Sequence, residues 1–303
     1  MAQAILFRFE ARGVWSAAPS GPSLVASDTF YGAVCAAMDH FGWLAEWLAA
    51  GPAVRLSSLF PWQQGTLFAP PPASAWPPVN GLQRLRPKLV RFLPLAAIAD
   101  LLEENGLVES RWVLDPASGC LLAADRAGPG GPFRPVSFEK AAGPKHGIQF
   151  AENGGLWGVA FCEDDLWRRR IEATLRWLAD AGVGGNRTLG WGSSTAVRFE
   201  TGETVTTVLR RSKQGDGSKG WWLLSLFAPA AEEIVHWEQG AYRLAVRSGW
   251  VEGTQTAKRS QRMVAEGSVI YAPEAPAGCL SDVTPEGCQH PVYRNGFAVA
   301  VPL

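Results

Sequence analysis

The sequence predicts an α+β fold whose N-terminal part is a ferredoxin-like unit. Three observations predict this class: an amphipathic helical pattern follows an N-terminal strand, a second one follows a strand near residue 156, and a glycine-rich loop then leads into a last strand. The order β-α-(insertion)-β-α-β is that of a split βαβ motif. A chain of 303 residues has room for two domains, which we place at 1–200 and 201–303.

Hydrophobic periodicity indicates the first strand and the first helix. Residues 2–10 read as a strand whose apolar face is formed by Ile5, Phe7 and Phe9. Ser27 is a good N-cap, and Asp28 suits the positive end of a helix. Apolar side chains then recur at helical spacing, ahead of a break at Gly51-Pro52; they are Phe30, Val34, Met38 and Phe41.

Residues 52–155 read as a β-rich insertion with irregular connections. Proline-rich stretches at 69–78 and 128–135 are incompatible with helix interiors and central strands, so we expect loops there. Residues 83–92 carry four positive charges and no negative one. The insertion is therefore expected to add loops and a basic surface to the unit.

The second helix closes the N-terminal unit. A strand at 156–162 precedes Glu163, Asp164 and Asp165, which favour a helix start. The apolar stripe of this helix consists of Trp167, Ile171, Leu175 and Leu178. The glycine loop at 181–192 and a strand at 194–200 follow.

The second half begins after a polar stretch at 201–220, which we interpret as a hinge or hairpin. Residues 229–239 form a candidate helix. Further strands are expected at 221–227, 242–247, 267–271 and 297–302.

The glycine loop is the segment with the clearest chemistry. Glycines permit positive φ and close approach of another chain, and exposed N–H groups in such a turn form an anion site to which Arg187 adds a planar cation. A helix C-cap accounts for Gly182 alone. A loop that binds a phosphate backbone is favoured over a plain connector because four glycines stay unexplained: Gly184, Gly185, Gly190 and Gly192.

Two nucleotide-binding motifs are excluded. Gly185 and Gly190 have Walker A spacing, but Trp191 follows where a lysine is required. A dinucleotide fingerprint needs glycine at Arg187. Both motifs run from strand to helix, whereas this loop runs from helix to strand, so we expect no nucleotide cofactor.

Composition limits the class of partner. Hydrophobic residues make up 47% of the chain, which supports a buried core, and 28 basic residues balance 28 acidic ones. Free-standing nucleic-acid binders are usually more basic. Any RNA contact is thus expected from local patches or from a surface shared with partner proteins, for which 14 tryptophans are suited.

The cysteines point to a reducing compartment and to no metal. The number is odd, no Cys-x-x-Cys pair occurs, and Cys279, Cys288 and His290 lack a nearby fourth ligand for zinc. No signal peptide or bilayer-spanning run is recognisable. We therefore expect a cytoplasmic protein without membrane contact, metal or other cofactor.

The glycine loop after the second helix resembles the signature of the RAMP superfamily of CRISPR proteins. Further blocks, in the same order, are similar to the subunit of type III-A (Csm) effectors that caps the 5′ tag of the guide RNA; the C-terminal ones favour type III-A over type III-B. These blocks are residues 27–35, 57–61, 88–95, 152–157, 258–268 and 290–296.

The resemblance implies two RRM-like, that is ferredoxin-like, domains and no catalytic site. Such a subunit binds the repeat-derived 5′ tag and docks a large polymerase-like subunit and the first backbone RAMP subunit. Guide pairing would read the target sequence, while the protein reads backbone and shape.

The resemblance and the local chemistry together assign candidate RNA-binding residues. The glycine loop supplies Gly184, Gly185, Asn186, Arg187, Thr188 and Gly190. Trp191 stacks on a base or packs beneath the loop, and Ser27 and Asp28 either bind a phosphate or simply cap their helix. Further candidates in basic segments are Arg84, Arg86, Lys88, Arg91, Lys145, His146, Lys258, Arg259 and Arg262.

Two other functions compete with this reading. Relatives of the fold cleave repeat RNA, which requires a general base, and His146 is the loop histidine nearest to a basic residue. The balanced charge and the tryptophans instead suit a protein-interaction scaffold without RNA contact.

Overall fold

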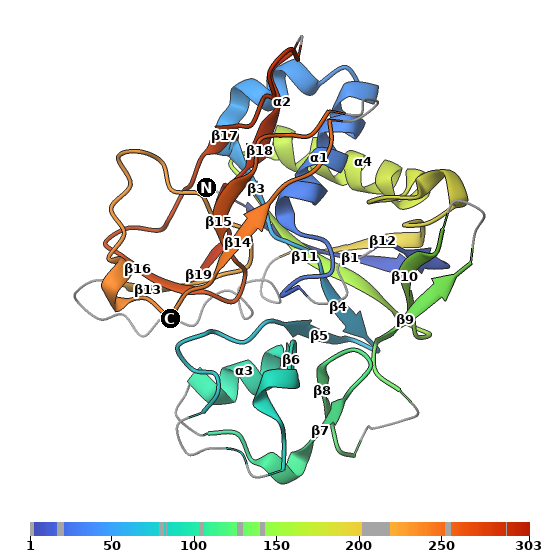
Figure 1. Ribbon diagram of the computed structural model, residues 1–303, viewed down its shortest axis with the longest axis vertical. Coiled ribbons are helices and arrows are strands. Elements are labelled where there is room, and N and C mark those ends of the chain that lie inside the picture. The colour runs from blue at the N-terminus through green and yellow to red at the C-terminus, as the bar shows by residue number, and fades with distance from the viewer. Residues whose placement is uncertain are drawn as a thin grey trace.

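The computed structural model describes residues 3–16, 21–78, 82, 84–102, 106–125, 130–139, 143–201, 219–251, 256–288 and 290–303. Most of the predicted hinge at 201–220 lies outside these residues. The fold is a mixed α+β arrangement, as predicted (Figure 1).

The N-terminal half is organised around one antiparallel sheet. Its strands follow the order β12 (Ser194–Glu200), β1 (Gln3–Ala11), β11 (Gly154–Cys162), β4 (Phe60–Gln63), β5 (Thr66–Ala69) and β6 (Leu93–Pro94). A short strand, β3 (Val54–Leu56), also pairs with β11. Strand β1 is central, so Leu6 is buried as well as the predicted face of Ile5, Phe7 and Phe9.

Two helices pack side by side on this sheet (Figure 1). They are α1 (Ser27–His40) and α4 (Asp165–Ala181). The predicted apolar stripe of α4 is buried, and so are Phe30, Val34 and Met38 in α1, whereas Phe41 follows the end of α1 and is half-buried. The hydroxyl of Thr174 in α4 donates to the sulfur of Met38 over 3.7 Å. Asp164 caps α4 by accepting from the backbone N–H of Trp167. A short helix, α2 (Leu44–Ala50), follows α1.

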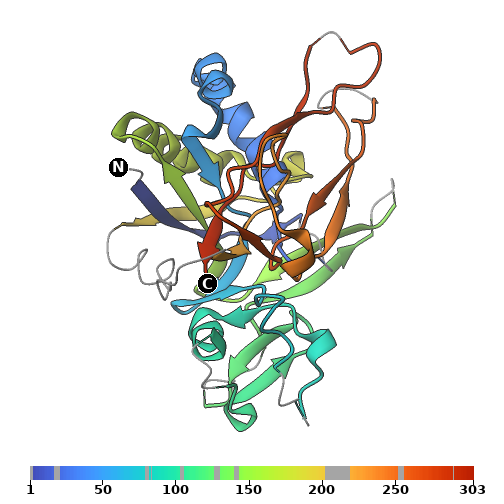
Figure 2. The same ribbon diagram turned by 90° about the vertical axis from the view of Figure 1, so that its left-hand side faces the viewer.

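The insertion is more regular than its prolines suggest. Strands β4 to β6 extend the main sheet, and α3 (Leu95–Leu102), β7 (Trp112–Asp115) and β8 (Cys120–Ala123) form a lobe below it (Figures 1 and 2). A separate sheet joins β2 (Val14–Trp15), β10 (Lys145–Phe150) and β9 (Phe133–Phe138).

The C-terminal half consists of small antiparallel sheets. One has the order β16 (Val269–Ala272), β13 (Lys219–Leu223), β19 (Ala300–Pro302). Two pairs accompany it: β14 (Leu244–Arg247) with β15 (Gln261–Val264), and β17 (Leu280–Asp282) with β18 (Tyr293–Asn295). The expected strands at 221–227, 242–247, 267–271 and 297–302 are confirmed with shifted ends, whereas β15, β17 and β18 were not predicted.

The candidate helix at 229–239 is wrong. Only a 3-10 turn, η5 (Trp237–Gln239), forms there. The carboxylate of Glu233 accepts from the backbone N–H groups of Ala230, Ala277 and Gly278 at 2.7–3.2 Å. These side-chain bonds hold the segment as a loop against residues 277–278, because they engage its carboxylate with backbone that is distant in sequence.

The two halves share a hydrophobic core. The largest buried cluster contains the N-terminal sheet and helices together with Trp222, Leu224, Val269, Val299 and Val301. Within the described residues, no helix has the length and apolar character required to cross a bilayer.

Candidate nucleic-acid interface

The glycine loop is a tight turn that closes on itself. Positive φ angles occur at Gly182, Gly184, Gly190 and Gly192, and Asn186 is also left-handed at 60°. The N–H of Val183 donates to the carbonyl oxygen of Gly192 over 3.1 Å, and a Cβ on Gly192 would overlap the carbonyl of Val183. Turn geometry therefore requires these four glycines, which weakens the sequence argument that they serve a ligand.

Gly185 differs from the other loop glycines. Its φ is not positive, it is exposed, and an added Cβ would lie 3.6 Å from the hydroxyl of Ser16, an ordinary contact. Ser16 holds this part of the loop by donating to the carbonyl of Gly185 at 2.8 Å and accepting from Asn186 at 3.1 Å. Arg187 and Thr188 follow in an exposed 3-10 turn, η4 (Arg187–Leu189), and Gly190 is exposed at its end.

Trp191 packs beneath the loop. The side chain is buried, and its ring lies 5.8 Å from that of Phe138 in β9. Of the two interpretations of this residue, packing is the one that the structure supports, and base stacking by Trp191 is withdrawn.

A groove lies between α1, the glycine loop and the C-terminal half. It has a volume of about 340 Å³. One wall is α1 with Asp28, Thr29, Gly32, Ala33 and Ala36; the others are formed by Gly184, Arg187, Ser248, Gly249, Trp250, Lys258, Tyr293 and Arg294. We call this feature the groove.

The walls of the groove differ in chemistry. The α1 wall has small side chains, and no atom would meet a Cβ on Gly32 within 4 Å, so a ligand can approach the helix closely. The C-terminal wall presents Trp250, which is 67% exposed, and Tyr293, which is 40% exposed. Arg187 and Lys258 add positive charge. Aromatic faces beside cations are what a single-stranded nucleic acid requires.

Sequence reasoning missed both aromatic residues of this wall. Trp250 follows Gly249 within a polar stretch, a context that disfavours burial and could have identified it. Tyr293 lies inside the block 290–296 that carried the family resemblance, but no role was assigned to it.

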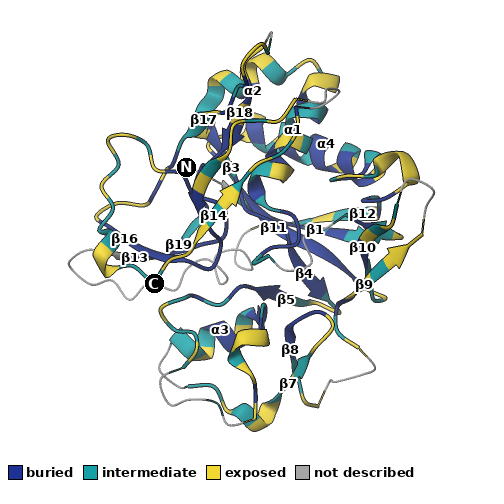
Figure 3. Cartoon of the chain, viewed as in Figure 1, coloured by how far each residue is buried: buried dark blue, intermediate teal, exposed yellow. Residues whose placement is uncertain are grey.

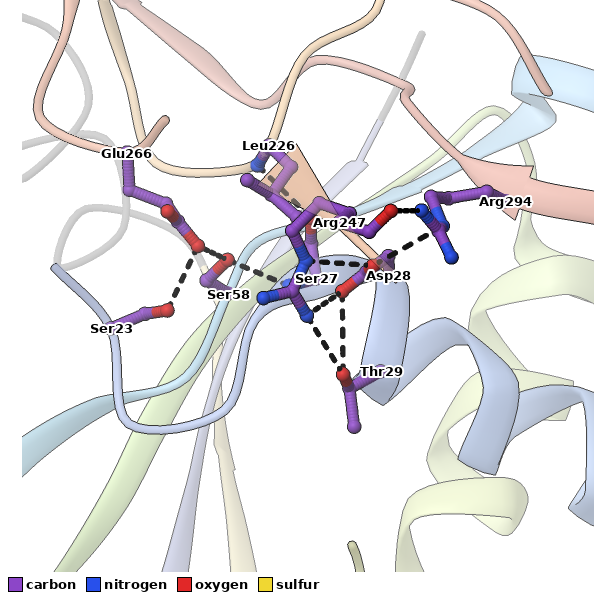
Figure 4. Close-up of polar contacts among 9 residues, drawn as sticks. All are labelled: Ser23, Ser27, Asp28, Thr29, Ser58, Leu226, Arg247, Glu266 and Arg294. Atoms are coloured by element: carbon purple, nitrogen blue, oxygen red, sulfur yellow. Dashed lines mark hydrogen bonds and ion pairs between the residues drawn. The ribbon is translucent and has the colours of Figure 1, made fainter. Parts of the chain in front are cut away.

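Asp28 has a structural role that the sequence did not reveal. Its carboxylate accepts from Arg247 at 2.7 and 3.0 Å and lies 3.6 Å from the Nε of Arg294 (Figure 4). The side chain is 7% exposed. Because two arginines already surround it, the carboxylate is no phosphate ligand, and that interpretation is corrected. Asp28 and Arg294 both line the groove, so this contact between the two halves forms part of its wall.

Burial affects the two arginines in different ways. Burial lowers the pKa of Arg294, with Asp28 acting in the opposite direction. For Arg247 burial also lowers the pKa, but hydrogen bonds and charge from Asp28 outweigh it, so the net shift is upward. Both remain cationic at neutral pH because an arginine titrates far above it.

Ser27 is also corrected. It is the first helical residue, with Ala26 in the N-cap position, and it is fully buried. Its hydroxyl accepts from the N–H of Leu226, and its own N–H donates to the hydroxyl of Ser58 at 2.8 Å. A buried hydroxyl is out of reach of a phosphate.

A second buried carboxylate lies next to this contact. Glu266 is 1% exposed and accepts from the hydroxyls of Ser23 and Ser58 (Figure 4). Burial raises the pKa of Glu266. We call the polar cluster drawn in Figure 4 the seam, because it joins the two halves; it comprises Ser23, Ser27, Asp28, Thr29, Ser58, Leu226, Arg247, Glu266 and Arg294.

The remaining candidates do not converge on the groove. Arg84, Arg86 and Lys88 are exposed, and Lys88 lines a separate cavity of about 450 Å³ together with Arg91 and Arg243. Arg91 is turned inward and donates to the carbonyl of Gly21 at 2.7 Å.

Two further predicted contacts need revision. Lys145 and His146 lie in strand β10 rather than in a loop, because they pair with β9, and the Nδ1 of His146 lies 2.9 Å from the hydroxyl of Ser137. Arg259 is exposed and pairs with Asp282 at 3.3 Å, whereas its neighbour Lys258 lines the groove. Arg262 is exposed on β15.

The described residues contain no cluster of three or more potential metal-ligating side chains. All five cysteines are free. Burial raises the pKa of Cys120 and of Cys162 to about 12, so both stay thiols at neutral pH.

Comparison with known proteins relates this fold to CRISPR proteins of the Csm4 type. Residues 216–303 match the family model of the CRISPR Csm4 C-terminal domain. A chain of the Csm3–Csm4 subcomplex of the type III-A CRISPR-Cas interference complex has a TM-score of 0.70 and 14% identity, covering 100% of this chain and 99% of that chain. A chain of the Csm1–Csm4 cassette with pppApA has a TM-score of 0.61 and 17% identity, covering 99% and 97%. No curated protein matches.

These findings confirm the resemblance stated from the sequence. The family match identifies a Csm4 C-terminal domain over residues 216–303. The structural likeness extends over the whole chain and, at such low identity, concerns its fold.

Proposed function

We propose that this chain, which belongs to the Csm4 family by its C-terminal domain, binds the repeat-derived 5′ tag of the guide RNA in a type III-A CRISPR effector. The groove is the observation that carries the proposal. It combines cations, exposed aromatic faces and a helix face of small residues in one surface.

Each wall of the groove has a part in this binding. Arg187 and Lys258 neutralise phosphates, while exposed backbone around Gly185 lets the RNA backbone lie on the loop. Trp250 and Tyr293 stack on bases, a contact that every base can make. Sequence in the target is then left to guide pairing.

The partners follow from the similar complexes. The similar chains come from a subcomplex of Csm3 with Csm4 and from a cassette of Csm1 with Csm4. We extend this to the present chain: it docks a backbone subunit of the Csm3 type and a large subunit of the Csm1 type, in the cytoplasm. The sheet order β12-β1-β11-β4, with α1 and α4 in the connections, supports a ferredoxin-like RAMP unit in the N-terminal half.

We propose no catalytic role. His146 does not line the groove and shares a hydrogen bond with Ser137 on the adjacent strand. A general base for cleavage must reach the 2′-hydroxyl of bound RNA. The position of His146 therefore supports binding of RNA without cleavage.

The charge contribution can be measured in the assembled complex. Arg187→Ala combined with Lys258→Ala should weaken binding of the 5′ tag and reduce the slope of log affinity against log salt by about 0.7 for each lost phosphate contact. Filter binding of synthetic tag RNA at several salt concentrations gives both quantities.

The control is Arg169→Ala, on the exposed side of α4 and 74% exposed. It should leave affinity and slope unchanged. Equal slopes for all three proteins would remove the groove from the RNA site. If the wild-type protein cleaved repeat RNA and His146→Ala abolished this cleavage, the endoribonuclease function would be supported instead.

A further inference from the structure

Strand β14 has a free edge. Among the described residues it pairs with β15 alone. The N–H of Ala265 donates to the carbonyl of Arg243, which places odd-numbered residues of β14 in hydrogen-bonded pairs. The backbone N–H and C=O groups of Leu244 and Val246 therefore point away from β15.

The same strand exposes apolar side chains. Leu244 is 58% exposed and Val246 is 68% exposed, whereas Ala245 packs inward and Arg247 contacts Asp28. Figure 3 shows this alternation along β14. Trp250, farther along the chain, borders the groove. Strand β14 is short, and Arg243 and Arg247 stand at its two ends, as is common for natural edge strands. Between these charges, however, the exposed face carries two apolar side chains beside outward backbone groups, an arrangement that suits pairing with another strand.

The chemistry at this edge favours a protein strand over RNA. Aliphatic side chains offer no face on which a base can stack, and outward carbonyl groups repel phosphates, whereas alternating N–H and C=O groups match another strand. Arg262 lies opposite Val246 on the same face and is exposed, as is Arg243. Neither makes an ion pair with another described residue. The complementary strand thus has alternate apolar side chains and a carboxylate facing Arg262.

We propose that the outer edge of β14 accepts a β-strand of a partner subunit, which extends the β14–β15 pair. The proposal rests on the proposed function in placing the chain in a multi-subunit effector. Because β14 leads along the chain into Ser248, Gly249 and Trp250 of the groove, the partner would lie near the guide RNA.

Hydrogen exchange in the reconstituted complex tests the backbone contact. The complex is assembled from this chain, guide RNA and the Csm1- and Csm3-type subunits of the same host. Peptides covering Leu244 and Val246 should exchange rapidly in the chain with RNA alone and at least about tenfold more slowly once the partner subunit binds.

A substitution tests the same edge. Val246→Lys places a charge in the strand interface and should lower retention of one partner subunit by about tenfold or more. The matched control is Val113→Lys, on β7, where the valine is 46% exposed. Arg262→Glu serves as the second variant, which reverses the charge and leaves β14 itself intact.

The outcomes separate this proposal from the proposed function. Loss of a subunit with guide RNA retained supports strand docking at β14. The proposal is overturned by slow exchange that RNA alone causes, or by full subunit retention in both Val246→Lys and Arg262→Glu. A wild-type complex that assembles without guide RNA in this chain's groove contradicts the proposed function, while protection of β14 by the partner would still stand.

Discussion

The seam and the groove are neighbours that share Asp28, Thr29 and Arg294, and their other charged groups lie in different environments. In the seam, Asp28, Arg247 and Arg294 satisfy one another within the chain, and Glu266 is enclosed by serine hydroxyls. In the groove, Arg187 and Lys258 border open volume beside the exposed Trp250. The contrast teaches that burial, and not residue type, separates the groups that join the two halves from the charged groups at the surface of the groove.

Breaking the seam should have the largest effect. Asp28→Ala removes the carboxylate between the buried guanidinium of Arg294 and the partly buried one of Arg247, so the free energy of unfolding should fall by about 3 kcal/mol. Urea unfolding measures this. Glu46→Ala, which removes the exposed partner of Arg170, is the control, with an expected cost of about 0–1 kcal/mol. Equal costs for the two variants would show that the seam contributes no more than a surface ion pair.

Two glycines of the glycine loop, Gly192 and Gly185, separate a structural role from a ligand-binding role. Gly192→Ala introduces a Cβ at positive φ against the carbonyl of Val183, and we expect a loss of stability of about 1–3 kcal/mol. Gly185→Ala should change the free energy of unfolding by less than about 0.5 kcal/mol, because the added methyl group makes only ordinary contacts within the protein. It should still weaken binding of the tag, because the methyl group would occupy the space that we propose for the RNA backbone. Thermal unfolding and RNA titration of both variants separate the two roles. If Gly185→Ala left RNA affinity intact, the RNA backbone would not lie on this residue.

The smallest effect concerns the pH dependence of the seam. Burial raises the pKa of Glu266 above its ordinary 4.5, so the folded protein binds this proton more tightly than the unfolded chain. The contribution of Glu266 to the free energy of unfolding is therefore complete below pH 4.5 and is lost as the pH rises through the pKa of Glu266 in the folded protein.

The variant E266Q removes this titration while its amide oxygen still accepts from both serines. It should be more stable than the wild type at neutral pH, with the difference vanishing toward pH 4. Urea unfolding across this pH range provides the measurement. A variant that is less stable than the wild type at neutral pH but not at pH 4 would mean that the ionised carboxylate stabilises the fold through Arg247.

Local patterns in the sequence predicted the parts of the fold that local physics determines. The spacing of Phe30, Val34 and Met38 identified α1, and the acids before Trp167 identified the start of α4. The position of the glycine loop was also predicted, because positive φ is a property of single residues.

Long-range contacts explain what could not be predicted. Ser27 has the sequence of an N-cap, but its hydroxyl is engaged by Leu226, which lies 199 positions away. Trp191 and Trp250 both follow a glycine, and contacts with residues distant in sequence, such as Phe138 and Gly147, bury the first. His146 was expected in a loop because its pairing with Ser137 across β9 and β10 is invisible to local periodicity.

The bond between Asp28 and Arg247 has a consequence for biosynthesis, because its two residues are 219 positions apart. A ribosome adding about 5–20 residues per second needs roughly 10–45 seconds between them. Throughout that interval α1 has emerged without the opposite wall of the groove. The groove is consequently complete only in chains whose translation is nearly finished, so the RNA binding that we propose would begin only at that stage.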